Sequence, residues 1–307
     1  IDILGDMICH PRLDEEDLER EKGVVCEEID MYKDSPEDAV HEILQKKIWK
    51  KQPLGYLISG KKKNVNGFTA SYIREYMDKY YVGENIVVSV AGNFKKKETL
   101  SWIKEAFYEV KSRGEAFIHN RIIPTYNTVS FVKEKDIEQL HMNLAFKAPS
   151  FMDEDRYAAV ILNNILGSDV NSRLFQTVRE NNGLTYSVCS YPSSFSDTGL
   201  LHIYAAMNET QYKKVYSLIE DIIYNLNEKG ITASELNDAK KQTIVEMTLS
   251  QDSTASRMSA NAKRVIYNVN NESFDERINR INDVTKSDVN KLIRKYLKME
   301  EMSKGII

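Results

Sequence analysis

The sequence is poor in cysteine and has no long apolar run. Its 307 residues include only Cys9, Cys26 and Cys189, and no two of these are spaced as C-x-x-C. So few thiols exclude a disulfide-stabilised scaffold and favour a reducing compartment. No run approaches the ~18 apolar residues of a membrane helix, and the first residues lack the basic start and apolar core of a signal peptide. We therefore expect a cytoplasmic protein that does not bind membranes.

An excess of positive charge is also missing. The formal net charge is −4 and the isoelectric point is about 5.9, so we do not expect nucleic acid as a partner. Lysines cluster at 46–51 and 60–64, but acidic neighbours surround them, which indicates a solvated face. Hydrophobic residues make up 42% of the chain, enough for real cores, and the length suggests two domains.

What is present begins with two glutamates in the segment "LEREKGVVCEEID" (18–30). Asp14 is a plausible N-cap of a helix here. Glu21 and Glu28 are seven positions apart, nearly two helical turns, so they share one face. That face is otherwise apolar, formed by Leu18, Val24, Val25, Ile29, Met31 and Tyr32. The sequence therefore predicts two carboxylates within the apolar arc of a helix.

Buried carboxylates need cations or protons, because an unpaired buried charge is too costly to keep. One interpretation is a salt bridge between helices, with the lysines of 46–51 as partners. The other is a metal site in which one carboxylate binds the ion and the other supports the site. The residues alone leave both interpretations open. Cys9 and His10 could form half of another metal site, but suitable partners are missing nearby.

The sequence also contains an internal repeat. "TASYIREYMDKYY" (69–81) matches "TKSDVNKLIRKYL" (285–297) at an offset of 216, and the helix with the two glutamates matches 235–247 at an offset of 218, where Glu28 meets Glu246. Two matches at nearly one offset indicate a duplicated domain. If both copies are built alike, roughly 100 residues of the first copy would precede Ile1.

The second copy reads as strands followed by helices. Gly183 suits a helix C-terminus, and Thr232-x-x-Glu235 forms a capping box. The predicted strands are 128–134, 141–149, 184–191 and 200–207, and the predicted helices are 153–167, 172–181, 209–229, 232–250 and 285–297. This order predicts an α+β fold of two homologous domains, each an antiparallel-rich sheet with a helical layer. Residues 1–112 would be the C-terminal part of a first domain truncated at its N-terminus, 113–126 a linker and 127–307 the second domain.

The segment "REKGVVCEEIDMYKD" (20–34) resembles the distal-glutamate helix of the insulinase/pitrilysin zinc metallopeptidases, particularly bacterial members similar to mitochondrial processing peptidase. In that family a His-x-x-Glu-His motif supplies two zinc ligands and the general base. A later glutamate completes the site, and another glutamate seven residues earlier assists. The resemblance implies that Glu28 is a zinc ligand and that Glu21 supports the site. Glu27 lies off the arc.

Two further segments carry the resemblance across the chain. "YYVGENIVVSVAGNF" (80–94) is similar to a strand of the family's first domain, and "GSDVNSRLFQTVRENNGLTYSV" (167–188) is similar to a stretch of its second domain. In the family an arginine and a tyrosine there help to hold the substrate. The resemblance assigns these roles to Arg179 and Tyr186. The alternative is that Arg179 pairs with a surface acid and Tyr186 packs in the core.

One part of the family pattern is absent, because His-x-x-Glu-His occurs nowhere in these residues. The five histidines are scattered: His10, His41, His119, His141 and His202. The resemblance places the missing motif upstream of Ile1. It implies a zinc-dependent endopeptidase that cleaves peptides or unfolded polypeptide segments between two clasping domains, and a chain inactive as given. The alternative is a catalytically silent binding or scaffold subunit. Family members include homodimers and heterodimers, so a homodimer stays open.

Overall fold

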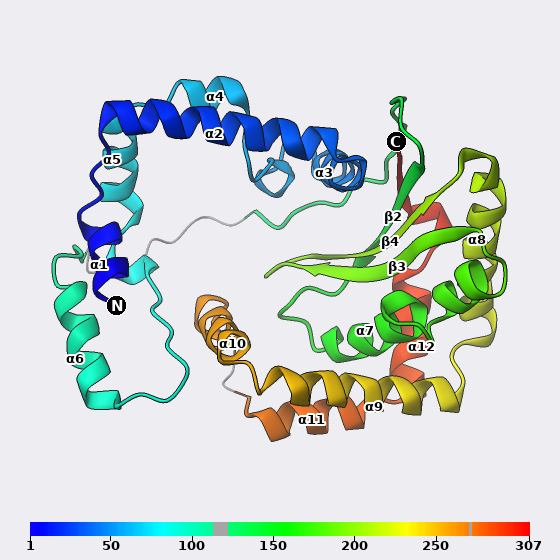
Figure 1. Ribbon diagram of the computed structural model, residues 1–307. Helices are drawn as coiled ribbons and strands as arrows, with labels where there is room; N and C mark the ends of the chain where they lie inside the picture. Colours follow the sequence, from blue (N-terminus) through cyan, green and yellow to red (C-terminus); the bar gives the residue numbers. More distant parts are fainter. Residues whose placement is uncertain (113–121, 270–271) are drawn as a thin grey trace. The chain divides into compact units, whose positions relative to one another are not determined.

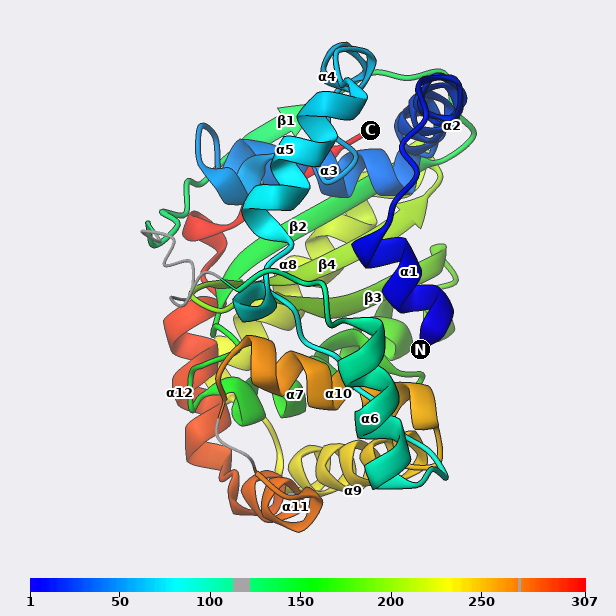
Figure 2. The ribbon, with the colours of Figure 1, turned by 90° about the vertical axis from the view of Figure 1, so that its left-hand side faces the viewer.

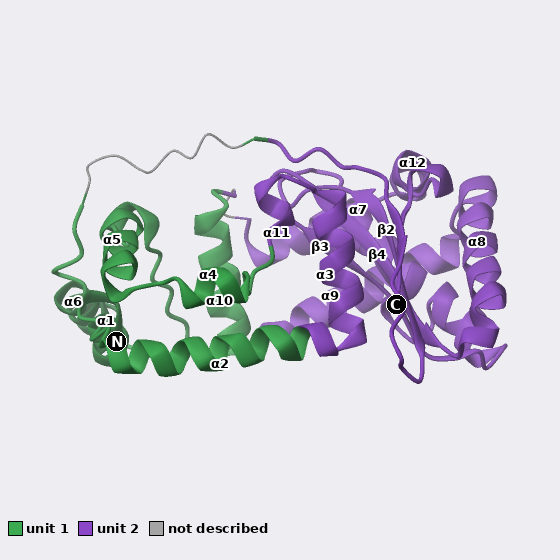
Figure 3. Cartoon of the chain, turned by 90° about the horizontal axis from the view of Figure 1, so that it is seen from above, with its two compact units in different colours: residues 1–32, 57–122, 253–268 green, residues 33–56, 123–252, 269–307 purple. Residues whose placement is uncertain are grey.

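The computed structural model describes residues 1–112, 122–269 and 272–307, which form two compact units (Figure 3). The first unit contains residues 1–32, 57–122 and 253–268, and the second contains 33–56, 123–252 and 269–307. Each unit therefore combines segments that are far apart in the sequence. Residues 113–121 of the predicted linker lie outside the described residues, and the predicted domain boundaries stay a prediction.

A five-stranded sheet forms the centre of the second unit (Figure 1). Its strands lie in the order β1 (Ser130–Val132), β5 (Ser303–Ile306), β2 (Leu140–Ala148), β4 (Gly199–Met207) and β3 (Thr185–Ser194). All neighbours are antiparallel except β1 and β5. Every residue of the interior strand β4 is buried, as expected for a strand covered on both faces.

Helices cover both faces of this sheet. The main core lies between the sheet and the helices α7 (Arg156–Asn163), α8 (Tyr212–Lys229), α9 (Ala233–Ser250), α11 (Phe274–Asp283) and α12 (Lys286–Tyr296). The other face is covered by α3 (Pro36–Ile48), whose Val40 and Leu44 are fully buried (Figure 2). The predicted α+β architecture is confirmed, and the predicted strands and helices are present. β5, α11 and α10 (Thr254–Ile266) were not predicted.

The first unit is helical in the part that the structure describes. It contains α1 (Asp2–Cys9), most of α2 (Glu15–Asp34), α4 (Lys62–Asn66), α5 (Ala70–Tyr80), α6 (Lys96–Ala106) and α10 (Thr254–Ile266). Gly5 lets α1 approach α6 closely, because a Cβ there would lie 2.7 Å from Ala106. Residues 86–94, expected to form a strand, have no pairing strand among the described residues. A strand needs a neighbour to satisfy its backbone groups, so this segment is not a strand in the described structure.

The element bounds repeat with the predicted offsets. Adding 216 to the bounds of α5 gives those of α12, and adding 218 to those of α3 gives those of α10. The caps repeat too, since Thr69 and Thr285 each accept a hydrogen bond from a backbone N–H of the first helical turn. Yet α3 belongs to the second unit and α10 to the first. The two copies have therefore exchanged equivalent helices, which no local sequence signal indicates.

Among the described residues, no helix has the length and apolar character that crossing a bilayer requires.

Candidate functional site

The predicted metal-binding glutamates lie on α2, as expected, but not in a buried position. Lys22 and Ile29 are the buried residues of this helix, whereas Glu21 and Glu28 are both exposed. The expectation that both carboxylates are buried is therefore wrong for the described chain. The apolar arc is split: Ile29 packs inside the first unit, while Val24 is 51% exposed beside the glutamates. An amphipathic pattern predicts a buried face only if another element covers it.

The salt-bridge interpretation finds no support either. In residues 1–112, 122–269 and 272–307, neither Glu21 nor Glu28 is in an ion pair. The ion pairs of α2 involve its other acids, such as Glu19 with Lys22 and Asp30 with Lys62. Glu21 and Glu28 are thus exposed carboxylates without an ion pair in the described chain, as are Glu15, Glu16 and Glu27 on the same helix.

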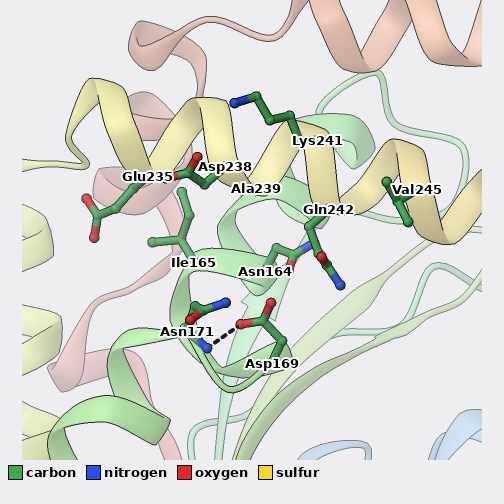
Figure 4. Close-up of a pocket in the computed structure, with 10 residues that line it drawn as sticks. All are labelled: Asn164, Ile165, Asp169, Asn171, Glu235, Asp238, Ala239, Lys241, Gln242 and Val245. Atoms are coloured by element: carbon green, nitrogen blue, oxygen red, sulfur yellow. Dashed lines mark hydrogen bonds between the residues drawn. The ribbon is translucent and has the colours of Figure 1, made fainter.

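Part of this face has a covered counterpart on α9. At an offset of 218, Glu21 corresponds to Ala239 and Val25 to Thr243, and both are buried, whereas Glu246, the counterpart of Glu28, is exposed. Asn164, at the end of α7, donates from its amide nitrogen to Thr243 Oγ1 at 3.0 Å. A cavity of about 370 Å³ remains beside this contact, lined by α9 and the loop near Asp169 (Figure 4). In the second unit, the end of α7 thus covers the counterpart of Val25 but leaves that of Glu28 exposed.

Arg179 and Tyr186 come together in the second unit. The Arg179 guanidinium lies 4.6 Å from the centre of the Tyr186 ring and 4.8 Å from that of Phe175. Tyr186 is 79% exposed, and Arg179 has no acidic partner among the residues described. The alternative of a surface ion pair and a core tyrosine is therefore wrong. The contact of Phe175 with Arg179 was not predicted, although residues four positions apart on a helix lie close together.

Two backbone features position this pair. The π-helical segment η4 (Phe175–Glu180) is closed by two hydrogen bonds around Gly183, from Gly183 N–H to Arg179 C=O and from Leu184 N–H to Val178 C=O. Tyr186 is then the extra residue of a β-bulge in β3, because Thr185 and Ser187 pair with the consecutive residues Met207 and Ala206. A bulge redirects a side chain out of the regular alternation. The result is an exposed aromatic ring beneath a half-buried cation.

Replacing Gly183 by alanine is expected to destabilise the protein by about 1 kcal/mol. Gly183 has φ +59°, and its Cβ position is free, so the cost is backbone strain in the left-handed region. Gly23→Ala in α2, where the Cβ position is also free, is the matched control and should stabilise by about 0.5–1 kcal/mol. Urea unfolding followed by circular dichroism measures both. Equal changes in the free energy of unfolding for the two substitutions would contradict a left-handed backbone conformation at Gly183.

The histidines do not form a metal site in the described part of the chain. No three His, Cys, Asp or Glu side chains converge there as ligands would. His10 contacts the carboxylates of Asp6 and Glu109 at 3.2 and 3.0 Å, and these two hydrogen bonds, that of Glu109 first, raise its pKa. Cys9 instead points at a backbone carbonyl of α6. His119 lies outside the described residues.

Family models match most of the chain. The model described as "Peptidase M16 inactive domain" matches residues 67–243, and that described as "Insulinase (Peptidase family M16)" matches residues 1–62. Among relatives, the chain is 38% identical over 297 residues to a protein of Bacillus subtilis named an uncharacterized zinc protease, covering 96% of this chain and 71% of that protein. A Streptomyces coelicolor protein of the same description is 32% identical, with 97% and 66% covered.

Solved structures show the same fold. A peptidase M16 inactive domain from Pseudomonas fluorescens superposes with a TM-score of 0.90 at 20% identity, over 99% of this chain and 73% of that chain. A protease from Helicobacter pylori gives 0.84 at 19% identity, over 99% and 75%. The chain thus spans about two thirds to three quarters of the length of these proteins. With the matching family models and the 38% identical relative, it belongs to the insulinase family, peptidase family M16.

Proposed function

We propose that this protein is part of a zinc-dependent endopeptidase in which Glu28 binds the metal and Glu21 supports it. The observation that carries the proposal is the exposed face of α2, where two carboxylates without ion-pair partners in the described chain lie among apolar side chains. Glutamate oxygen is a common zinc ligand in catalytic sites. One carboxylate is too few for a site, so the other ligands come from a His-x-x-Glu-His helix in sequence preceding Ile1.

The second unit supports this arrangement by analogy within the chain. On α9, the counterpart of Val25 is covered by the end of α7, where Asn164 contacts Thr243. A helix in the same relation to α2 would bring its side chains to Val25 and would leave Glu28 accessible beside it, as its counterpart Glu246 is exposed.

The chain's own residues have distinct tasks in this reaction. A zinc ion bound at Glu28 would supply Lewis-acid activation of water. Glu21, on the same face, would orient the site by accepting a hydrogen bond from a neighbouring ligand. Arg179 has several N–H groups not used in ion pairs, and its stacking on Tyr186 fixes the guanidinium plane. It can donate to a peptide carbonyl and stabilise the charge that develops on its oxygen.

The protein expressed with the sequence preceding Ile1 is expected to retain about one zinc ion and to cleave an unfolded polypeptide such as reduced, carboxymethylated lactalbumin. A chelator should abolish cleavage, and added zinc should restore it. Residues 1–307 alone should neither retain zinc nor cleave the polypeptide. Polypeptide binding without zinc and without cleavage would instead establish the alternative, a silent binding subunit.

A further inference from the structure

A connected group of polar side chains lies beneath α3 on the sheet of the second unit. We call His41, Asn143, Tyr191 and His202 the α3 cluster. Asn143 on β2 is fully buried; its amide nitrogen lies 2.6 Å from His41 Nδ1, and its carbonyl oxygen lies 3.2 Å from His202 Nδ1. Tyr191 on β3 contacts the His41 ring through its hydroxyl and stacks on His202 with centroids 4.9 Å apart. The cluster therefore joins α3 to three strands.

The hydrogen bonds of Asn143 fix the protonation of both histidines. An amide nitrogen is only a donor, so His41 Nδ1 must accept and carries no proton. An amide oxygen is only an acceptor, so His202 Nδ1 must donate. His41 Nδ1 also contacts the Tyr191 hydroxyl, so a proton on Nδ1 could be donated to Tyr191 but would face the Asn143 N–H, and the hydrogen bond from Asn143 would be lost. The contact between α3 and β2 thus requires a neutral His41.

The surroundings do little to stabilise a charged His41. Burial is the largest effect and lowers the pKa of His41 to about 4, against the weaker attraction of Asp38 and with a small contribution from His141. Burial likewise lowers the pKa of His202 to about 3. The titratable groups around His41 on each packed element are Glu37 and Asp38 on α3, His141 on β2, Cys189 and Tyr191 on β3, and His202 and Tyr204 on β4.

We propose that His41 is an acid-sensitive latch, which holds α3 on the sheet while neutral and loosens it when protonated. Apolar contacts of α3, such as those of Val40 and Leu44, remain and keep the helix near the sheet. The latch does not depend on the proposed peptidase activity.

The direction of the pH effect follows from the lowered pKa of His41. With an ordinary pKa of 6.5 when α3 is undocked and about 4 when docked, docking gains its full stability above pH 6.5 and loses it as the pH falls to 4. The equilibrium constant for docking should change by at most about 300-fold across this range. Acidic conditions weaken docking, and neutral conditions restore it.

Hydrogen exchange of the α3 amides between pH 6.5 and 4, corrected for intrinsic rates, tests the latch. Protection of α3 in the wild-type protein should fall by up to about 300-fold relative to His41→Gln, whose side-chain oxygen still accepts from Asn143 but does not titrate. His10→Gln, an exposed site in the other unit, should behave as wild type. The same loss of protection in His41→Gln as in wild type would overturn the proposal.

A second measurement needs no variant. The carbon-13 shift of the His41 imidazole in the wild-type protein reports its titration directly. A midpoint near 4, together with the loss of α3 protection, supports the latch. A midpoint near 6.5 would overturn it, since docking would then be indifferent to the charge of His41.

Discussion

Replacing Glu28 by glutamine is expected to remove zinc and peptide cleavage together, in the protein that includes the sequence preceding Ile1. The amide oxygen of glutamine is neutral and a far weaker ligand than a carboxylate. Substitutions of residues that only support a metal site cost about 10–100-fold in affinity or activity, so the loss of a ligand should cost at least about 100-fold in both. Metal analysis after gel filtration and cleavage of an unfolded polypeptide measure the two effects.

Glu27→Gln is the matched control, because Glu27 is the adjacent exposed carboxylate of the same helix and its substitution changes the charge equally. This variant should retain zinc and cleave the polypeptide at the wild-type rate. Glu21→Gln should fall between the two, with weaker zinc retention, since Glu21 acts through another ligand. If Glu28→Gln kept its zinc while Glu27→Gln lost it, the ligand would be Glu27 and the face assigned to the site would be wrong. Retention by both would refute zinc binding on α2.

Replacing Arg179 by leucine is expected to reduce kcat/KM about 100- to 1,000-fold while the zinc content stays unchanged. Leucine keeps apolar contact with the rings of Phe175 and Tyr186 but cannot donate hydrogen bonds. The loss of one donor to a developing oxyanion typically costs that factor. Arg179→Leu should therefore lose cleavage but keep zinc, whereas Glu28→Gln should lose both.

Arg280→Leu is the control for Arg179. Arg280 is a half-exposed arginine of the same unit that pairs with Glu154 and Glu272, so its loss changes charge equally without touching the pair of Arg179 and Tyr186. Surface ion pairs contribute little to stability, so this variant should fold and cleave normally. Wild-type cleavage by Arg179→Leu would leave Arg179 as a purely structural partner of the two rings.

Local signals predicted much of this fold. Helix starts were visible as Thr232 with Glu235 and as Thr285, and both form capping boxes in the structure. Gly183 marked a helix end because only glycine adopts a positive φ at low cost. These features depend on residues within one or two turns, so the sequence carries them completely. Short segments without such signals, such as β5, were missed because only pairing with β1 and β2 defines them.

The sequence also placed Glu21 and Glu28 on one face, but it did not decide what meets that face. Helical periodicity is a local property, whereas burial depends on an element that approaches from elsewhere. The expectation of buried carboxylates assumed such an element, and the described residues do not provide it. Arg179 and Tyr186 are in contact for the opposite reason, since both lie next to the turn that brings them together, while their proposed role stays a prediction.

By itself the sequence indicated most helices of the second copy, the capping box at Thr232, the internal repeat and four candidate site residues, all of which rest on local spacing or on similarity. Only the tertiary structure decided that α3 and α10 are exchanged between the units, that Phe175 joins Arg179 and Tyr186, and that His41, Asn143 and His202 form one hydrogen-bonded group. The physical reason is separation along the chain. His41 lies about 100 residues from Asn143, and side chains so distant are brought together only by the packing of a helix on a sheet.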